Sequence, residues 1–213
     1  MSAKPLKYYF RPEENLNIAT HGLGVLLSIV ALVLLIGKAR AAATPYYLVS
    51  FTVFGISLIL LYTASTLYHA SVRPELRSKF KVLDHAVIFV LIAGTYTPFT
   101  LITLHGWVGW TIFGVVWGIA AVGMVFKLFH TGRYEKISTI AYVAMGWIIV
   151  FAIVPLIQNL ASGGLWWLLA GGACYTLGAV LYRMHNLPYN HAIFHVFVLL
   201  GSFSHFMAVY KFV

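Results

Sequence analysis

Seven long apolar stretches, joined by short connections, constrain this chain more than any other feature of its sequence. They lie near residues 18–36, 46–68, 82–104, 107–129, 137–160, 165–182 and 191–212. Each is about as long as the ~20 residues that a helix needs to cross the hydrocarbon core of a bilayer. Only 9% of the residues are charged, whereas a soluble domain carries about 25%. The sequence therefore predicts an all-α fold, a polytopic bundle of seven transmembrane helices in a single membrane domain over residues 1–213.

The distribution of Lys and Arg predicts how this bundle is oriented. Eleven of these residues fall on the side of the N-terminus and three on the opposite side. The positive-inside rule then places the N-terminus, with residues 1–16 as a cytoplasmic segment, inside the cell and the C-terminus outside. The net charge of +9 is thus a consequence of topology, and we expect no nucleic-acid partner. The expected location is the plasma membrane, which the chain crosses several times.

Prolines and glycines indicate where the helices bend or meet. Pro98 and Pro155 fall inside apolar stretches and should kink the helices there. The spacing Gly114-x3-Gly118 allows two helices to approach closely. Glycine is common in membrane helices, so an oligomer is possible but is not indicated by this spacing.

Five polar side chains lie in or at the ends of these apolar stretches: Ser65, His69, Asp84, His191 and His195. Ser65 and His69, like His191 and His195, are four residues apart, so each pair projects from one helix face. The predicted orientation places all five near the cytoplasmic face. Ionisable groups are costly inside a membrane, and this cluster therefore predicts a functional site.

Three imidazoles and a carboxylate at one membrane depth suit a zinc ion. We expect His69, His191 and His195 to be the ligands, because neutral imidazole is a preferred zinc ligand and a catalytic zinc typically has three protein ligands and one water. Zinc lowers the pKa of its water to about 7. Asp84 would position that water or shuttle its proton, and Ser65 would orient an imidazole or contact a substrate carbonyl.

Simpler explanations exist for each of these residues. A His pair at this spacing can be accidental. Asp84 could form an ion pair with Lys79 or Lys81. The Ser65 hydroxyl could bond the backbone carbonyl four residues earlier. His205 lies ten residues beyond His195, about 15 Å deeper along a helix, and has no assigned role.

A second polar group opens the chain as Glu14-x2-Asn17-x2-Thr20-His21. Steps of three and four residues place several of these side chains on one side of a helix. They could cap the N-terminus of the first helix. Alternatively, Glu14, Asn17 and His21 support the metal ligands or cover the cytoplasmic mouth of the site as a lid. His21 could also be a fourth ligand, which would favour a structural role for the zinc.

Three segments together resemble the bacterial hemolysin III proteins: residues 64–69 (ASTLYH), 93–99 (AGTYTPF) and 188–195 (PYNHAIFH). The opening Glu14-x2-Asn17-x2-Thr20-His21 fits too, and the likeness covers nearly the whole chain. That family is grouped with the progestin and adiponectin receptor family and, more distantly, with alkaline ceramidases.

The resemblance implies a seven-helix bundle with a cytoplasmic N-terminus in the bacterial inner membrane. It also implies zinc on His69, His191 and His195, with Asp84 and Ser65 matching a shared Asp and Ser. In the wider superfamily the chemistry is hydrolysis of lipid amides such as ceramide, whereas the bacterial members were named for lysing red cells. The long N-terminal extension of the animal receptors is missing, so hormone reception is not expected.

Three functions follow as hypotheses. The first is a zinc-dependent hydrolase that acts on a lipid amide or ester at the cytoplasmic face. The second is a pore-forming or lytic protein in which zinc only ties helices together. The third is a receptor-like lipid sensor that binds without turnover. A membrane lipid is the expected substrate or ligand in the first and third, and the sequence does not identify it.

Overall fold

The computed structural model describes residue 6 and residues 8–42, 44–184 and 186–213. In that part of the chain all regular structure is helical, and seven helical spans are long and apolar enough to cross a membrane. The elements are α1 (Arg11–Arg40), α2 (Pro45–Ala70), α3 (Pro74–Pro98), α4 (Gly106–His130), α5 (Glu135–Gly146), α6 (Ile153–Asn159), α7 (Ser162–Arg183) and α8 (Asn190–Phe212). A π-helical segment (Phe99–Thr103) continues α3, and a 3₁₀ segment (Ile148–Ala152) joins α5 to α6 into one span. The predicted fold class is confirmed.

The ends of the helices follow the local chemistry. Pro45 and Pro74 stand at the start of α2 and α3, where a missing N–H leaves no helical hydrogen bond unmade. Gly132 has φ +85° in the turn between α4 and α5, a conformation that a side chain disfavours. α1 begins at Arg11, seven residues before the predicted stretch, and so six residues of the expected N-terminal segment 1–16 are helical. Lys4 and Lys7, which contributed to the predicted orientation, lie outside the described residues.

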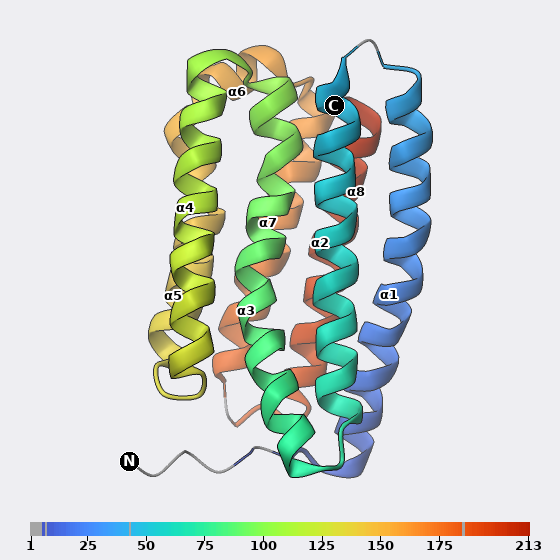
Figure 1. Ribbon diagram of the computed structural model, residues 1–213, viewed down its shortest axis with the longest axis vertical. Coiled ribbons are helices and arrows are strands. Elements are labelled where there is room, and N and C mark those ends of the chain that lie inside the picture. Colours follow the sequence, from blue (N-terminus) through green and yellow to red (C-terminus); the bar gives the residue numbers. More distant parts are fainter. Residues whose placement is uncertain (1–5, 7, 43, 185) are drawn as a thin grey trace.

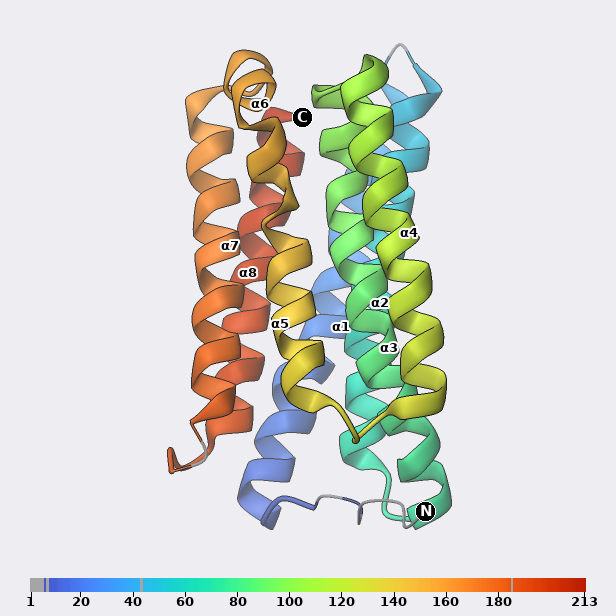
Figure 2. The same cartoon turned by 90° about the vertical axis from the view of Figure 1, so that its left-hand side faces the viewer.

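The helices form a single ring-like bundle. α1 packs against α2 and α8, α2 against α3, α3 against α4, and α7 against α8. α5 touches α3 and α7. In Figure 2 it faces the viewer and stands between the pair α3 and α4 and the pair α7 and α8. Figure 1 shows that α1 begins at one end of the bundle and that the chain ends at the other. Because successive spans alternate in direction, the end of α2 and the starts of α1, α3 and α8 share one end.

Both prolines predicted to disturb a helix lie beside irregular backbone. The π-helical segment directly follows Pro98, and the 3₁₀ segment ends three residues before Pro155. The side chain of Tyr96 stabilises the backbone at the 3₁₀ segment. Its hydroxyl donates to the carbonyl of Gly146 at 2.7 Å and accepts from the backbone N–H of Ile149 at 2.9 Å. α3 therefore supplies the partners that the broken span cannot find within itself.

α1 buries a small or polar face and exposes an apolar one. Along α1 the buried positions recur every three or four residues and are mostly small or polar: Glu13, Asn17, His21, Gly24, Ser28, Ala31, Leu35 and Ala39. The opposite face carries exposed large apolar side chains, including Leu26 and Val33, which are 63% and 65% exposed. This face suits lipid. On α4, a Cβ added to Gly114 or Gly118 would meet nothing within 4 Å, so neither glycine marks a close contact between helices in the described part of this single chain.

Candidate functional site

Three histidines from two helices converge at the end of the bundle where α1 begins. His69 lies in the last turn of α2, and His191 and His195 lie in the first turns of α8. The Nε2 atom of His191 is 3.0 Å from Nε2 of His69 and 3.0 Å from Nε2 of His195. One ligand atom from each of the three buried residues lies within 4.8 Å of the others, which is close enough to hold a single metal ion. The sequence predicted this grouping of the three residues.

Hydrogen bonding alone does not account for the way these rings meet. The Nδ1 atom of His69 lies 2.6 Å from Oε2 of Glu14 and therefore carries the proton, because a carboxylate only accepts. The Thr20 hydroxyl donates to the carbonyl of Leu16, so it accepts from Nδ1 of His195 at 3.4 Å. Nε2 of His69 and of His195 then present lone pairs to His191.

Nε2 of His191 can carry only one proton, so it can donate a hydrogen bond to only one of these two lone pairs. A shared cation would satisfy all three nitrogens. The donor set therefore fits a metal ion better than it fits a network of neutral imidazoles.

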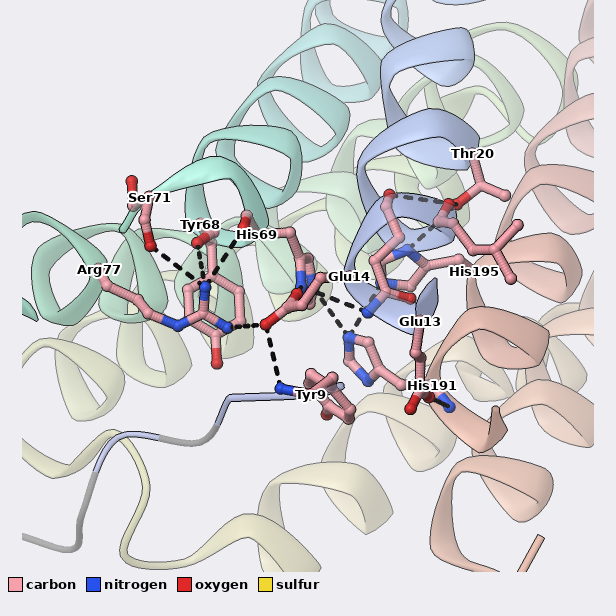
Figure 3. A network of polar contacts seen from close by, with 12 residues as sticks. Tyr9, Glu13, Glu14, Thr20, Tyr68, His69, Ser71, Arg77, His191 and His195 are labelled. Atoms are coloured by element: carbon pink, nitrogen blue, oxygen red, sulfur yellow. Dashed lines mark hydrogen bonds and ion pairs between the residues drawn. The ribbon is translucent and has the colours of Figure 1, made fainter. Parts of the chain in front are cut away.

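Glu14 is the main support of His69 (Figure 3). Its Oε2 holds the Nδ1 proton of His69, and its Oε1 accepts from the backbone N–H of Tyr9 at 3.1 Å and from the guanidinium of Arg77. Carboxylates that fix the tautomer of a ligating imidazole in this way are typical of metal sites. Asn17 approaches the same edge of His69, with Nδ2 3.4 Å from Nδ1. The N-cap of α1, Phe10, has no side-chain cap hydrogen bond, so the capping interpretation of this polar group is wrong.

Two further charged side chains secure the helix ends that carry the histidines. Arg77, which is 1% exposed, donates to the carbonyls of Tyr68, His69 and Ser71 at 3.2–3.3 Å. They lie at the C-terminus of α2, where carbonyls run out of helical partners; the carbonyl of Tyr68 also accepts from the backbone N–H of Ser71 at 3.3 Å. Glu13 of α1 accepts from the backbone N–H of His191 at 3.2 Å, at the N-terminus of α8, where negative charge is favourable.

Aromatic rings close the site on two sides. His21 stacks on His195 with ring centroids 3.5 Å apart and an interplanar angle of 10°. A ring that stacks on a ligand in this way does not direct its nitrogens at the same ion, and His21 is not part of the converging group. Tyr9 stacks on His191 at 4.7 Å. It precedes α1, and burial raises the pKa of its phenol, so this side chain stays neutral beside the site.

A cavity of about 600 Å³ opens beside the histidines. Ser65 and Asp84 line it together with His191, His195 and His21. Asp84 does not belong to the converging group of possible ligands. The ion pair that the structure gives Lys81 is with Glu135, at 3.8 Å, and not with Asp84.

Most of the cavity wall is apolar. It extends along α3, α5, α7 and α8, far beyond the histidines, and its lining includes Leu91, Ile92, Ile149, Val150, Leu165 and Leu168. His205 also lines it, away from the converging histidines, and its Nε2 donates to the carbonyl of Leu168 at 3.3 Å. The arrangement is a polar, metal-suited group at one end of a space that suits an alkyl chain.

Sequence reasoning missed Tyr9, Glu13 and Arg77 as parts of the site. Arg77 was counted only as a loop charge that sets orientation. A signal was present, because Glu13 and Glu14 are the acidic residues of the first turn of a membrane helix and need partners there. Which partners they find depends on the tertiary contact between α1, α2 and α8.

The fold and this group of residues define an integral, multi-pass membrane protein with a histidine triad inside its helical bundle. A family model described as "Haemolysin-III related" matches residues 9–206. The chain belongs to the haemolysin III family, which confirms the resemblance seen in its motifs.

Curated relatives match along nearly the whole chain. The protein called Hemolysin-3 of Bacillus cereus is 48% identical over 200 residues, which cover 94% of this chain and 91% of that protein. A Hemolysin-3 homolog of Bacillus subtilis is 45% identical, covering 92% of both. The human Monocyte to macrophage differentiation factor is 26% identical and covers 94% of this chain and 84% of its own length. No solved structure gives a significant match.

Proposed function

We propose that this protein is a zinc-dependent hydrolase that acts on a lipid amide or ester at the cytoplasmic face of the membrane. The observation that supports it most is the convergence of His69, His191 and His195 at the edge of a large apolar cavity. Among the described residues no fourth His, Cys, Asp or Glu joins that group. Three protein ligands and one open position are the usual arrangement of a catalytic zinc, whereas structural zinc sites usually have four protein ligands.

The choice of zinc rests on the ligands and their spacing. Imidazole nitrogen bonds zinc at about 2.0–2.1 Å, which in a tetrahedral site separates neighbouring nitrogens by about 3.3 Å. The contacts of 3.0 Å from His191 to its two neighbours are close to that value. Glu14 holds the proton on Nδ1 of His69, so that Nε2 is free to ligate.

The chemistry divides between the ion and the surrounding side chains. When bound, zinc would activate a water and polarise the carbonyl of the scissile bond. Asp84 would accept the proton of the attacking water and deliver it to the leaving amine or alcohol, either directly or through one water. Ser65, one turn before His69, would donate a hydrogen bond to the substrate carbonyl. The apolar part of the cavity would hold the acyl chain and exclude bulk water from the reacting bond.

The charge distribution supports the cytoplasmic location. The triad lies at the end of the bundle where α1 begins, and nine of the twelve Lys and Arg residues that the structure describes fall on that side. Under the positive-inside rule this end faces the cytoplasm. A substrate would therefore come from the inner leaflet.

Turnover of a panel of lipid amides and esters by the purified, zinc-loaded protein tests this function. We expect Asp84→Asn to lower turnover about 10²–10⁴-fold, the range for a general acid–base group, while zinc stays bound. Glu75→Gln is the matched control, because Glu75 is an exposed carboxylate at the start of the same helix. Absence of turnover by zinc-loaded protein, or turnover that Asp84→Asn leaves unchanged, would contradict the proposal. Binding without turnover would favour a lipid sensor.

The name of the Bacillus cereus relative motivates a second candidate, a lytic protein whose zinc is structural. Leakage of a dye from liposomes containing the protein tests it. A lytic protein with structural zinc should cause leakage that Asp84→Asn does not reduce. Intact liposomes at high protein-to-lipid ratios would remove this candidate.

A further inference from the structure

The cavity beside the histidines extends along most of the bundle. On α7 its lining begins at Tyr182, whose ring centroid lies 5.4 Å from that of His191, and ends at Ser162, the first residue of the helix. These two positions on α7 are twenty residues apart, which corresponds to about 30 Å along a helix. The hydrocarbon core of a bilayer has about the same thickness. The cavity therefore continues past the depth of the inner leaflet to that of the outer one.

The lining of this cavity is continuous from one end to the other. In Figure 2, α7 and the span made by α5 and α6 both run between the two ends of the bundle. α7 contributes lining residues at every turn, among them Tyr182, Ala179, Thr176, Gly172, Leu169, Leu165 and Ser162. The span of α5 and α6 contributes them from Glu135 to Ile157, and α3 from Asp84 to Phe99. The described residues thus border one elongated space, which suits an extended chain.

Charged side chains line this space only toward the histidine end, as far as the structure describes the chain. They are Asp84 of α3, Lys127 in the last turn of α4 and Glu135 in the first turn of α5. The opposite end is mainly apolar, with Leu156, Ile157, Leu165 and Trp166 in its lining. A second head group or a hydrated ion is costly in such surroundings. The distribution therefore fits a molecule with one polar end and one long apolar tail.

Polar side chains of α7 and α8 that line the middle of the space are bonded to the protein. The hydroxyl of Tyr175 lies 2.9 Å from that of Ser202, and the hydroxyl of Thr176 accepts from the indole N–H of Trp147 at 3.1 Å. His205 donates to a backbone carbonyl of α7. The middle therefore offers an occupant mainly apolar surface, as the two walls of α3 and α5 do.

Gly172 keeps this space open halfway along α7, ten residues from either end of the lining. A Cβ added there would lie 3.6 Å from the ring of Trp147, an ordinary contact, so the position can carry a side chain but has none. C–C bonds of about 1.52 Å at angles of about 111° advance an extended chain by about 1.25 Å each, so about 30 Å holds about 20–24 carbons. We infer that the substrate carries a very long acyl chain of this length, and that Gly172 lets the chain pass the middle of the cavity. The inference rests on the proposed function in so far as the carbonyl of the lipid lies at the triad, and it names the substrate class.

Photo-crosslinking of chains of two lengths to the full-length protein in lipid nanodiscs tests the inference. The probes are methyl ketones with chains of ten and twenty carbons and a diazirine at the end of the chain. A ketone offers the carbonyl of an amide or ester but no bond that water can cleave, so binding is measured without turnover. Mass spectrometry of the digested protein then locates the end of each chain. The variants are Gly172→Leu and, as a matched control, Gly114→Leu on α4, where nothing lies within 4 Å of an added Cβ.

We expect the end of each chain to reach a different depth in wild-type protein and in Gly114→Leu. Extended chains of ten and twenty carbons span about 11 Å and about 24 Å, so on α7 the shorter should crosslink within residues 172–179 and the longer within residues 162–169. Gly172→Leu fills the middle of the cavity and should lower crosslinking of the longer chain to residues 162–169 by about tenfold, as for an overpacked site. The shorter chain ends before Gly172 and should be unaffected.

Crosslinks of both chains to the same residues, or of the longer chain to the lipid-facing sides of α1 and α4, would overturn the inference. So would a pattern for the longer chain that Gly172→Leu leaves unchanged. Should Gly172→Leu fail to give a monodisperse protein, loss of the deep crosslinks in Gly172→Val decides the same question. Because the ketones are not hydrolysed, failure here leaves hydrolysis of lipids with shorter chains standing, and failure to find turnover leaves the depth of chain binding standing.

Discussion

The corner formed by α1, α2 and α8 and the wall formed by α5 are built in opposite ways. In the corner, Glu14 bonds His69 and Arg77 at once, and Glu13 bonds the start of α8. The helices approach closely there: a Cβ added to Gly24 would lie 2.4 Å from the ring of Tyr62. The α5 span is broken by the 3₁₀ segment Ile148–Ala152, touches its neighbours sparsely and borders the cavity.

This difference suits two separate tasks within one bundle, metal binding in the corner and accommodation of a lipid chain at the wall. A metal site needs ligands held in fixed positions by packing and by hydrogen bonds to their other ring atoms. A cavity for a lipid chain needs apolar surface and a wall that can adapt. Regions with few buried contacts are the ones that open most readily. We therefore expect substitutions in the corner to weaken metal binding or stability strongly, and substitutions in the wall to act locally.

The largest effect is expected for Glu14→Gln in the corner. The amide cannot hold the Nδ1 proton of His69 as a carboxylate does, and Arg77 loses its ionic partner. Loss of such a supporting group typically weakens metal affinity about 10–100-fold. Competition with a zinc chelator measures it, and Glu75→Gln, an exposed change, should leave the affinity unaltered. Equal zinc affinities in wild type and Glu14→Gln would show that the carboxylate of Glu14 does not support the metal site.

Gly24→Ala should destabilise the corner by about 1–3 kcal/mol, the usual range for overpacking. The added methyl group would overlap the ring of Tyr62, which is itself fully buried. The thermal unfolding midpoint in detergent measures the change. Gly114→Ala is the control on α4, because nothing lies within 4 Å of its added carbon. Similar midpoints for the two variants would show that the α1–α2 contact is looser than described.

The smallest of the three effects is expected for Tyr96→Phe, a substitution that tests whether the α5 wall responds separately from the corner. It removes the hydroxyl that accepts from Ile149 and donates to Gly146, at a cost of about 1–2 kcal/mol for the unpaired backbone groups. Hydrogen exchange should accelerate over residues 146–152 and stay unchanged in α1 and α8. Tyr46→Phe, at an exposed tyrosine, is the control. Faster exchange spread equally over the whole bundle would show that the wall is not a separate unit.

The number of spans and the residues of the triad could both be predicted from the sequence. Long apolar stretches are unambiguous, and His191 and His195 share a face at any helical register. That His69 meets them also followed, because topology places the end of α2 and the start of α8 at one depth. The same logic left His205 outside the triad, as the structure has it.

Partners that lie across helix contacts could not be predicted. Arg77 serves Glu14, 63 residues away, and the carbonyls at the end of α2, and nothing in the local pattern of a basic loop indicates this. The start of α1 at Arg11 was also missed, because its first turn is polar and hydropathy alone places the helix later. The cavity depends on the sparse packing of α5, a property of side-chain shape that periodicity does not report.

Metal analysis of wild-type protein purified without added metal, combined with X-ray absorption at the zinc edge, tests the central claim most directly. The account predicts close to one zinc per chain, bound by three imidazole nitrogens and one oxygen from water, and loss of that zinc in His191→Ala. Protein that carries no zinc, or zinc that His191→Ala retains with an unchanged absorption spectrum, would contradict it.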